Sequence, residues 1–331
     1  MKKLFIISNE SIFNYQGKFF CDNIDMKSTP EGLSNKFEVN IIARKSNNIR
    51  SHKIDLKNVN IYGNIISFLF GVLRAVKNEN SKYLIISISP FTTLACIVLA
   101  FFKKKANVYL RSNGHEEYRS ILGFLGPAIY HIMFFIVSKF SHLISCREHI
   151  LRGRKGDIVQ PSQLSRKWLS NHKPSQIDKI KLLYVGRIRV EKGIFALSEL
   201  IRNKRDISLT IIGAEKGSSN KINQSNIKIL PTQSNKTKLI KHYDDHNIFV
   251  LPSFTEGHPM VLLEALARRR PVVIFDDIKH VIGDKKGIFV TKRNFLSFLG
   301  TLNNIKKNYK KIQKDMKKNK LPTNKEFIDK F

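Results

Sequence analysis

The sequence predicts an α/β protein built from two doubly wound, Rossmann-like domains whose parallel sheets face a central cleft. Its strand-like segments are almost unbroken apolar runs, such as "YLIISIS" and "PVVIF", which is typical of parallel strands buried on both faces. These runs alternate with longer helix-like segments, and the whole series occurs twice along the chain. A length of 331 residues also exceeds what one ordinary core accommodates.

The first series defines an amino-terminal domain over residues 1–160. In doubly wound sheets ligands bind at the carboxyl ends of the strands, so the loops that leave strands are where functional residues are expected. The expected strands are 3–8, 38–44, 83–89, 107–112 and 142–146, and the expected helices lie within 64–78, 90–104, 118–140 and 147–153.

A polar stretch with two prolines, 161–177, predicts a linker, and the series restarts in a carboxy-terminal domain over 178–331. The expected strands are 181–186, 208–213, 227–230, 248–253 and 271–275, with helices near 193–203, 236–244 and 259–269. Near the end of the chain, apolar side chains at spacings of three and four predict one helix stripe. This stripe consists of Leu302, Ile305, Tyr309, Ile312 and Met316. The last helix is also a candidate to pack back toward the amino-terminal domain.

The chain carries 58 Lys and Arg against 26 Asp and Glu, a formal net charge of +32. An excess this large indicates an anionic partner, such as nucleic acid, a phosphorylated small molecule or an anionic membrane surface. Biased genomic composition explains the same excess equally well. Because the basic residues do not form a recognisable module with interleaved aromatic residues, we expect no nucleic-acid partner.

The cysteines and apolar runs bear on location. Three cysteines lie far apart, with neither metal-ligand spacing nor a disulfide framework, which favours a reducing cytoplasm. The amino terminus turns polar too early for a signal peptide. The longest apolar runs, 91–102 and 128–137, are shorter than the roughly 18–20 residues that span a bilayer. We therefore expect a cytoplasmic protein, either soluble or peripheral on the inner face of the membrane.

Two features leave alternatives open on membrane contact. The apolar segments of the first domain are better explained as core helices, and a surface that docks on a membrane is the alternative. The eight lysines between 306 and 320 suit a solvated helix face, or a contact with anionic lipid.

A basic loop in the second half is the first chemical signal. In "LLYVGRIRVEKGIFAL" a strand ends at Gly186 and a helix starts near Gly193, so Arg187 and Lys192 lie on one loop. A diphosphate requires compact positive charge, and a guanidinium can bind two phosphate oxygens at once. An ordinary basic loop is the alternative, but the glycine at the helix start favours a phosphate site.

The second signal is a pair of carboxylates in "PSFTEGHPMVLLEALA", where Glu256 and Glu264 are separated by seven residues. The chain turns through Gly257 and His258, and Pro259 suits the first position of a helix. The free N–H groups and dipole of that helix start favour an anion. The second carboxylate suits paired hydroxyls, such as those of a ribose. The alternatives are a capping role for Glu256 and a buried ion pair for Glu264. Together with the basic loop, however, the two carboxylates indicate one ligand, a nucleotide sugar.

The stretches "GRIRVEKG", "PSFTEGHPMVLLEALA" and "RPVV" resemble the second domain of GT-B fold glycosyltransferases. More closely, they resemble the retaining family four, or group 1, enzymes of bacterial polysaccharide and lipopolysaccharide synthesis. In that family the loop Arg and Lys hold the donor diphosphate, the second Glu contacts the ribose, and the first approaches hydroxyls of the transferred sugar. The resemblance implies these roles for Arg187, Lys192, Glu264 and Glu256 in that order.

The resemblance extends to further residues. Backbone amides around Gly257, His258 and Pro259 would lie near the sugar and phosphate. His115 follows the strand "NVYL" and matches a family histidine close to the transferred sugar, although a surface loop histidine is the alternative. Gly17 matches family glycines that let backbone approach the donor phosphate.

Two departures from the family concern the donor. Three arginines, 268–270, stand where the family usually has a glycine before "PVV", and "DDIKHVIGDKKGIFV" shortens a Gly-rich, acid-containing loop. The base and sugar of the donor therefore stay open.

The resemblance implies a retaining glycosyltransferase that moves a sugar from a nucleotide-diphosphate sugar to a glycan or lipid-linked acceptor bound by the first domain. Its predicted catalytic residues are Glu256, whose carboxylate would stabilise an oxocarbenium-like sugar, and His115. No two aspartates have Asp-x-Asp spacing, so we expect no metal and no other cofactor; the basic loop and the helix start would neutralise the leaving diphosphate. A GT-B nucleotide-sugar epimerase is the alternative, and a basic nucleic-acid-binding protein is a more distant one.

Overall fold

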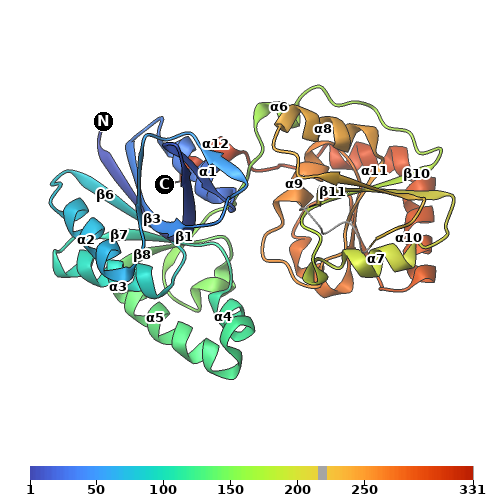
Figure 1. Ribbon diagram of the computed structural model, residues 1–331. Helices are drawn as coiled ribbons and strands as arrows, with labels where there is room; N and C mark the ends of the chain where they lie inside the picture. The colour runs from blue at the N-terminus through green and yellow to red at the C-terminus, as the bar shows by residue number, and fades with distance from the viewer. Residues whose placement is uncertain (215–221, 331) are drawn as a thin grey trace. The chain divides into compact units, whose positions relative to one another are not determined.

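The computed structural model describes residues 1–214 and 222–330, which divide into two compact units (Figure 1). One unit holds residues 1–161 together with the segment that starts at Asn324, and the other holds Ser162–Thr323. Most of the stretch expected as a linker therefore packs with the second unit, and the end of the chain packs with the first.

The first unit is built on a nine-stranded sheet. Seven strands are parallel in the order β5-β3-β1-β6-β7-β8-β9. In addition, β2 pairs antiparallel with β1, and β4 pairs antiparallel with β2. The strands are β1 (Lys3–Tyr15), β2 (Lys18–Cys21), β3 (Glu38–Ser46), β4 (His52–Ile54), β5 (Asn58–Tyr62), β6 (Ser81–Ile86), β7 (Ala106–Leu110), β8 (Ser141–Ser145) and β9 (Gly156–Ile158).

Helices cover both faces of this sheet. On one face the inner stripes of α2, α3 and α5 join a single core with the strands, and on the other α1 and the carboxy-terminal α12 form a second core. Asn64 and Ser89 begin α2 and α3 with capping boxes, which satisfy backbone N–H groups at the helix starts. The helices are α1 (Asp25–Leu33), α2 (Ile65–Val76), α3 (Pro90–Phe101), α4 (Gly114–Leu122), α5 (Gly126–Phe140) and α12 (Asn324–Ile328).

Helix is confirmed within 118–140, but the stretch belongs to two helices, α4 and α5, that fold back on each other. Gly123 has a φ of +65°, and a Cβ on Gly126 would lie 1.9 Å from the carbonyl oxygen of Tyr118. The rings of Tyr118 and Tyr130 meet across the hairpin at 5.3 Å. The helix expected within 147–153 is only one short 3-10 turn, Glu148–Leu151.

The first strand is longer than expected and leads into a β-hairpin. It runs to Tyr15, past a register shift between Ile7 and Ser11, and pairs with β2. Gln16 and Gly17 form the two-residue turn with φ of +49° and +76°. Turns of this hand require positive φ at both positions, which by itself accounts for a glycine there.

The second unit is a six-stranded, all-parallel sheet in the order β12-β11-β10-β13-β14-β15. Together with the first sheet, this confirms the expected α/β class with parallel sheets. The strands are β10 (Ile180–Val185), β11 (Ile207–Ala214), β12 (Ile227–Pro231), β13 (Ile248–Leu251), β14 (Val272–Phe275) and β15 (Ile288–Thr291). The helices are α6 (Arg166–Leu169), α7 (Ile194–Leu200), α8 (Lys236–Asp245), α9 (Met260–Ala267), α10 (Phe295–Lys307) and α11 (Tyr309–Met316).

The expected apolar stripe near the end of the chain packs into the second unit. Leu302, Ile305, Tyr309 and Met316 are buried and Ile312 is partly buried, which confirms the pattern. The stripe is carried by two helices rather than one, because α10 ends and α11 begins at Asn308.

Two of the three arginines that depart from the family pattern are structural. Arg268 and Arg270 are each 1% exposed. The Arg268 guanidinium donates two hydrogen bonds to the carboxylate of Asp244, both at 2.9 Å, and others to the carbonyl oxygens of Trp168 and Ser170. Asp244 is thus an ion-pair partner, and hydrogen bonds from Arg268 link the segment around α6 to α8 and α9.

Candidate active site

The two loops singled out in the second half meet at a direct ion pair. Lys192, at the end of the β10–α7 loop, places its Nζ 2.7 Å from Oε1 of Glu256 in the β13–α9 loop. The two side chains are 23% and 11% exposed, so the pair is partly shielded from water. Ser253, fully buried, donates its hydroxyl to the same Glu256 oxygen at 2.7 Å.

Backbone packing holds these loops together. The N–H of Phe254 donates to the carbonyl of Glu191 at 3.0 Å. Gly193 has a φ of +64°, and a Cβ there would lie 1.9 Å from the carbonyl oxygen of Pro252. Only a residue without a side chain lets the two loops approach this closely, so Gly193 is required by packing and by its backbone conformation.

Arg293, just after β15, was not singled out from the sequence, yet it anchors the site. Its guanidinium donates to the carbonyl of Pro252 at 2.9 Å and to the carboxylate of Asp277 at 2.7 Å. It also lies 4.1 Å from the ring centre of Phe254 and 4.3 Å from that of Phe275. Its position after a strand of the same sheet was the available signal.

His280 is another contributor that sequence reasoning missed. Its Nε2 lies 2.7 Å from the carbonyl oxygen of Glu256, to which the ring donates. The segment 276–281 follows β14, so the loops after β10, β13, β14 and β15 all converge on residues 252–256. This is the carboxyl edge of the sheet, where doubly wound folds bind ligands.

Glu264 lies on α9, on the side that faces α8. The hydroxyl of Tyr243 donates to its Oε2 at 2.9 Å. Burial raises the pKa of Glu264 to about 7, and the Tyr243 hydrogen bond and the charge of Lys236 offset only part of this effect. The carboxyl group therefore titrates close to neutral pH.

The other predicted donor residues of this unit flank the ion pair. Arg187 is exposed, and its guanidinium has no ion-pair partner among residues 1–214 and 222–330, while its carbonyl accepts from Tyr184 at 2.8 Å. Gly257 is exposed, and His258 is partly buried. Pro259 is the N-cap of α9 rather than its first helical residue, with an extended backbone.

In the first unit, His115 is buried rather than a surface loop residue. It sits in the first turn of α4, 7% exposed, with its ring 4.7 Å from that of Tyr130 on α5. Its Nε2 lies 3.5 Å from Nδ1 of His131. Burial, reinforced by the charge of Arg152, lowers the pKa of His115 to about 4, so the imidazole is neutral at pH 7.

The carboxyl edge of the first sheet gathers a further polar group that the sequence did not reveal. Arg111, which follows β7, donates from its Nε to the hydroxyl of Ser87 at 3.2 Å and lies 3.7 Å from the carboxylate of Asp25. Ser87 itself adopts a φ of +65°, a conformation rare for residues other than glycine. Burial raises the pKa of the nearby Glu10, against the lowering effect of Arg111.

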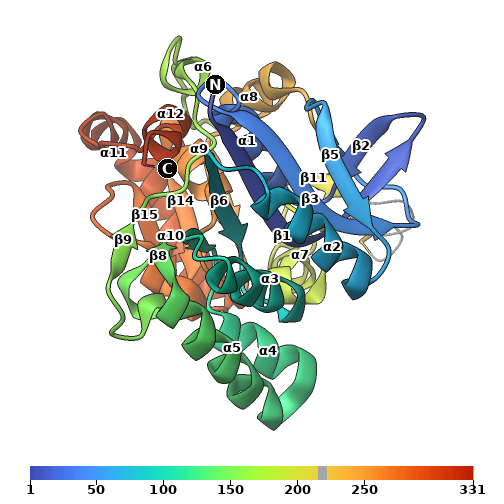
Figure 2. The same ribbon diagram turned by 90° about the vertical axis from the view of Figure 1, so that its left-hand side faces the viewer.

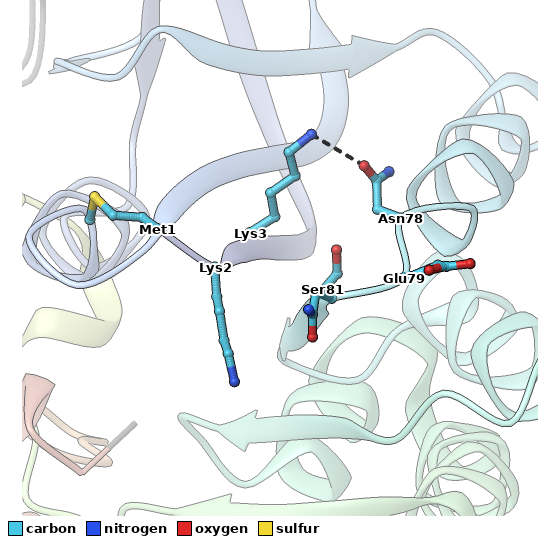
Figure 3. A pocket seen from close by; sticks show the side chains of 7 residues that line it. Met1, Lys2, Lys3, Asn78, Glu79 and Ser81 are labelled. Atoms are coloured by element: carbon cyan, nitrogen blue, oxygen red, sulfur yellow. Dashed lines mark hydrogen bonds between the residues drawn. The ribbon is translucent and has the colours of Figure 1, made fainter.

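A pocket of about 510 Å³ lies at the opposite end of the first sheet (Figure 3). It is lined by the starts of β1 and β6 and by Asn78, whose side chain accepts a hydrogen bond from Lys3 at 3.2 Å. Because it opens at the amino ends of parallel strands, it does not belong to the ligand edge of this sheet.

Comparison with known proteins assigns the second unit. Residues 167–321 match the family model described as Glycosyl transferases group 1. CapM of Staphylococcus aureus, a capsular polysaccharide biosynthesis glycosyltransferase, is 32% identical over 132 residues, which are 36% of this chain and 34% of that protein. TuaC of Bacillus subtilis, described as a teichuronic acid biosynthesis glycosyltransferase, is 35% identical over 100 residues, 30% of this chain and 25% of that protein. The chain thus spans well under half the length of these curated relatives.

Solved structures are similar over the whole chain. Sucrose-phosphate synthase from Thermosynechococcus elongatus superposes with a TM-score of 0.66 at 16% identity, covering 100% of this chain and 94% of that one. The lipopolysaccharide outer core galactosyltransferase WaaB gives 0.64 at 15% identity, covering 99% and 97%. At such identities the likeness concerns the fold alone, and it confirms the expected GT-B class. The resemblance to group 1 glycosyltransferases is confirmed by the family match.

Proposed function

Because the second unit carries a group 1 glycosyltransferase domain on a GT-B fold, we propose that this chain is a glycosyltransferase of bacterial surface polysaccharide synthesis. Its donor would be a nucleotide-diphosphate sugar bound by the second unit, and its acceptor a glycan or lipid-linked glycan bound by the first. The observation that carries this proposal is the contact of Lys192 with Glu256, which joins a cation for phosphate to a carboxylate for sugar at one ligand edge.

The leaving diphosphate needs positive charge as its bond to the sugar breaks. Lys192 and the exposed guanidinium of Arg187 come from one loop, and the N–H groups at the start of α9 add the positive end of a helix dipole. We propose that these groups serve in place of a metal ion. The phosphate would exchange for Glu256 as the partner of Lys192 when the donor binds.

Glu256 is the proposed catalytic carboxylate. Within the described residues, its side chain contacts Lys192 and Ser253, both through Oε1. Oε2 accepts no side-chain hydrogen bond from the described part of the chain, so it is available to a hydroxyl of the transferred sugar. A carboxylate at this point would stabilise the positive ring of an oxocarbenium-like transition state with retention at the anomeric carbon. Glu264, with its ionisation near neutrality, is the proposed ribose ligand.

The first test separates donor binding from transfer. Lys192→Ala should weaken binding of a nucleoside diphosphate and lower transfer at least about 100-fold, whereas Glu256→Gln should lower transfer with a smaller effect on binding. Binding is measured as a ligand-induced rise in melting temperature across a panel of nucleotide sugars, and transfer as acceptor-dependent release of nucleoside diphosphate. Lys311→Ala and Glu191→Gln, at exposed positions, are matched controls.

A fully active Lys192→Ala variant would reject the diphosphate assignment. Release of nucleoside diphosphate without any acceptor would favour an epimerase instead. Proton NMR of the product should show the anomeric configuration of the donor, and inversion would contradict the retaining mechanism. Transfer should also survive excess EDTA; loss of transfer that Mg²⁺ or Mn²⁺ restores would overturn the metal-free proposal.

A further inference from the structure

The helix layer α2, α3 and α5 of the first unit is apolar on both sides. The inner stripes of the three helices form the core with the sheet. Their outer stripes are also apolar and face solvent, and α3 packs between α2 and α5, so these stripes adjoin (Figure 2). The exposed residues of these stripes are Ile66, Phe70, Leu94, Ile97, Phe101, Ile129, Ile132 and Phe135, which we call the apolar face.

The turn between α4 and α5 continues this character. It is taken here with the last two residues of α4, as Ile121–Leu125, and within this segment Phe124 is 87% exposed and Ile121 is 70% exposed. Turns at a water-facing surface are normally polar. The stretch 114–140 has the length and composition of a membrane-spanning helix, but it folds as a hairpin, so it is suited to lie at a bilayer surface rather than to cross one.

Positive charge borders the apolar face. The helices that join parallel strands all end at the same edge of the sheet, and α2, α3 and α5 contain no Asp or Glu. At this edge the segments 74–81, 103–105, 139 and 152–155 contribute one acid, Glu79. The basic residues of this edge are Arg74, Lys77, Lys103, Lys104, Lys105, Lys139, Arg152, Arg154 and Lys155. The guanidinium of Arg154 lies 5.5 Å from the ring centre of Phe135, so the two kinds of surface meet.

We propose that the apolar face and the Ile121–Leu125 turn dock this protein on an anionic lipid bilayer. A lipid bilayer matches both parts of this surface. The apolar side chains would contact acyl chains, and the basic edge would contact anionic headgroups. A second copy of the chain fits less well. A symmetric dimer places the same patch on both partners, and this patch would bring lysines and arginines together with almost no acids to pair them.

The test is flotation of the purified protein with phosphatidylcholine vesicles, with and without phosphatidylglycerol. The protein should float with the anionic vesicles and much less with the neutral ones. Phe124→Ser with Leu125→Ser should lower the partition coefficient at least about tenfold. Lys103→Gln with Lys105→Gln should lower binding to anionic vesicles several-fold, as should added salt.

The matched control is Leu296→Ser, which removes an apolar side chain of similar exposure, 81%, from the second unit. All substituted side chains are exposed, so the melting temperature should be unchanged. No flotation of the wild-type protein, or an equal loss for Leu296→Ser, would overturn the proposal. So would a dimer in light scattering that Phe124→Ser converts to a monomer, because a second copy would then cover the face. The assay contains no sugar donor, so its result is independent of the proposed activity.

Discussion

At the scale of single residues, the site owes its form to a few side chains whose partners lie far away in the sequence. Lys192 and Glu256 were each singled out for separate tasks, one for phosphate and one for sugar. Their ion pair at 2.7 Å shows that the two side chains lie at one point of the sheet edge and hold each other in place. Ser253, Arg293 and His280 form hydrogen bonds with the segment that bears the carboxylate, and these contacts limit its motion.

The pKa of Glu264 gives a prediction at this scale. An acid whose pKa is raised on folding binds its proton more tightly in the folded state, so stability falls as pH rises from the unfolded value near 4.5 through the folded value of about 7. Glu264→Gln cannot ionise and can still accept the Tyr243 hydrogen bond. We expect it to raise the free energy of unfolding by roughly 1–3 kcal/mol at pH 8 and to change it little at pH 5.

The measurement is thermal or urea unfolding of both proteins from pH 5 to 8. The same variant should weaken nucleotide binding if the carboxylate contacts the ribose. Equal destabilisation or stabilisation at both ends of the pH range would show that burial does not shift this group.

At the scale of elements, the end of α9 explains how the chain tolerates three arginines in place of the family glycine. Arg269 takes the left-handed conformation, φ +54°, that a glycine would adopt after a helix, while Arg268 and Arg270 turn inward. Arg269 thus takes a conformation that favours glycine, and the charges of Arg268 and Arg270 are compensated by buried hydrogen bonds. Helix α9, which follows the β13–α9 loop, is therefore held at its carboxyl end by contacts with α8 and α6.

Adjacent substitutions here should have opposite signs. Arg268→Met leaves Asp244 without its main partner, and we expect it to lower the free energy of unfolding by about 3–5 kcal/mol. Arg269→Gly removes the strain of the left-handed conformation and should raise the free energy of unfolding by about 0.5–1 kcal/mol. Denaturant unfolding of both variants checks this, and destabilisation by Arg269→Gly would contradict the proposed role of the backbone.

At the scale of the whole molecule, the chain ends in the unit where it began. After leaving the second unit near Thr323, it forms α12, which packs against α1 and buries Phe327 and Ile328 in the first unit. The Phe327 ring lies 5.7 Å from that of Tyr109 on β7. The packing of α12 therefore contributes to the stability of the first unit.

Phe327→Ala should lower the stability of the first unit by about 3–5 kcal/mol, because a large buried ring is removed. Limited proteolysis with mass spectrometry should show faster cleavage within residues 1–161 and unchanged cleavage within 162–323. Lys330→Ala, at an exposed position on the same segment, is the control. Faster cleavage confined to the second unit would refute this packing role.

The sequence by itself determined the features that local physics controls. Unbroken apolar runs of this length are typical of strands covered on both faces. The parallel strands, and the positions of the loops that follow them, could therefore be predicted from the pattern. The basic loop and the Glu-x7-Glu segment each follow a strand, and parallel strands bring such loops to one edge. This is why Lys192 and Glu256 could be assigned to one site from residues 64 positions apart.

Only the tertiary structure decided which long-range partners meet. The fold of 114–140 into a hairpin depends on Gly123 and on close packing against Tyr118, and neither changes the apolar pattern of the segment. Arg293 and His280 join the site through the register of neighbouring strands. The burial of His115 and the return of α12 likewise depend on contacts across the fold. A sequence pattern specifies which side of an element is apolar, but the partner of that side is fixed only when whole layers pack together.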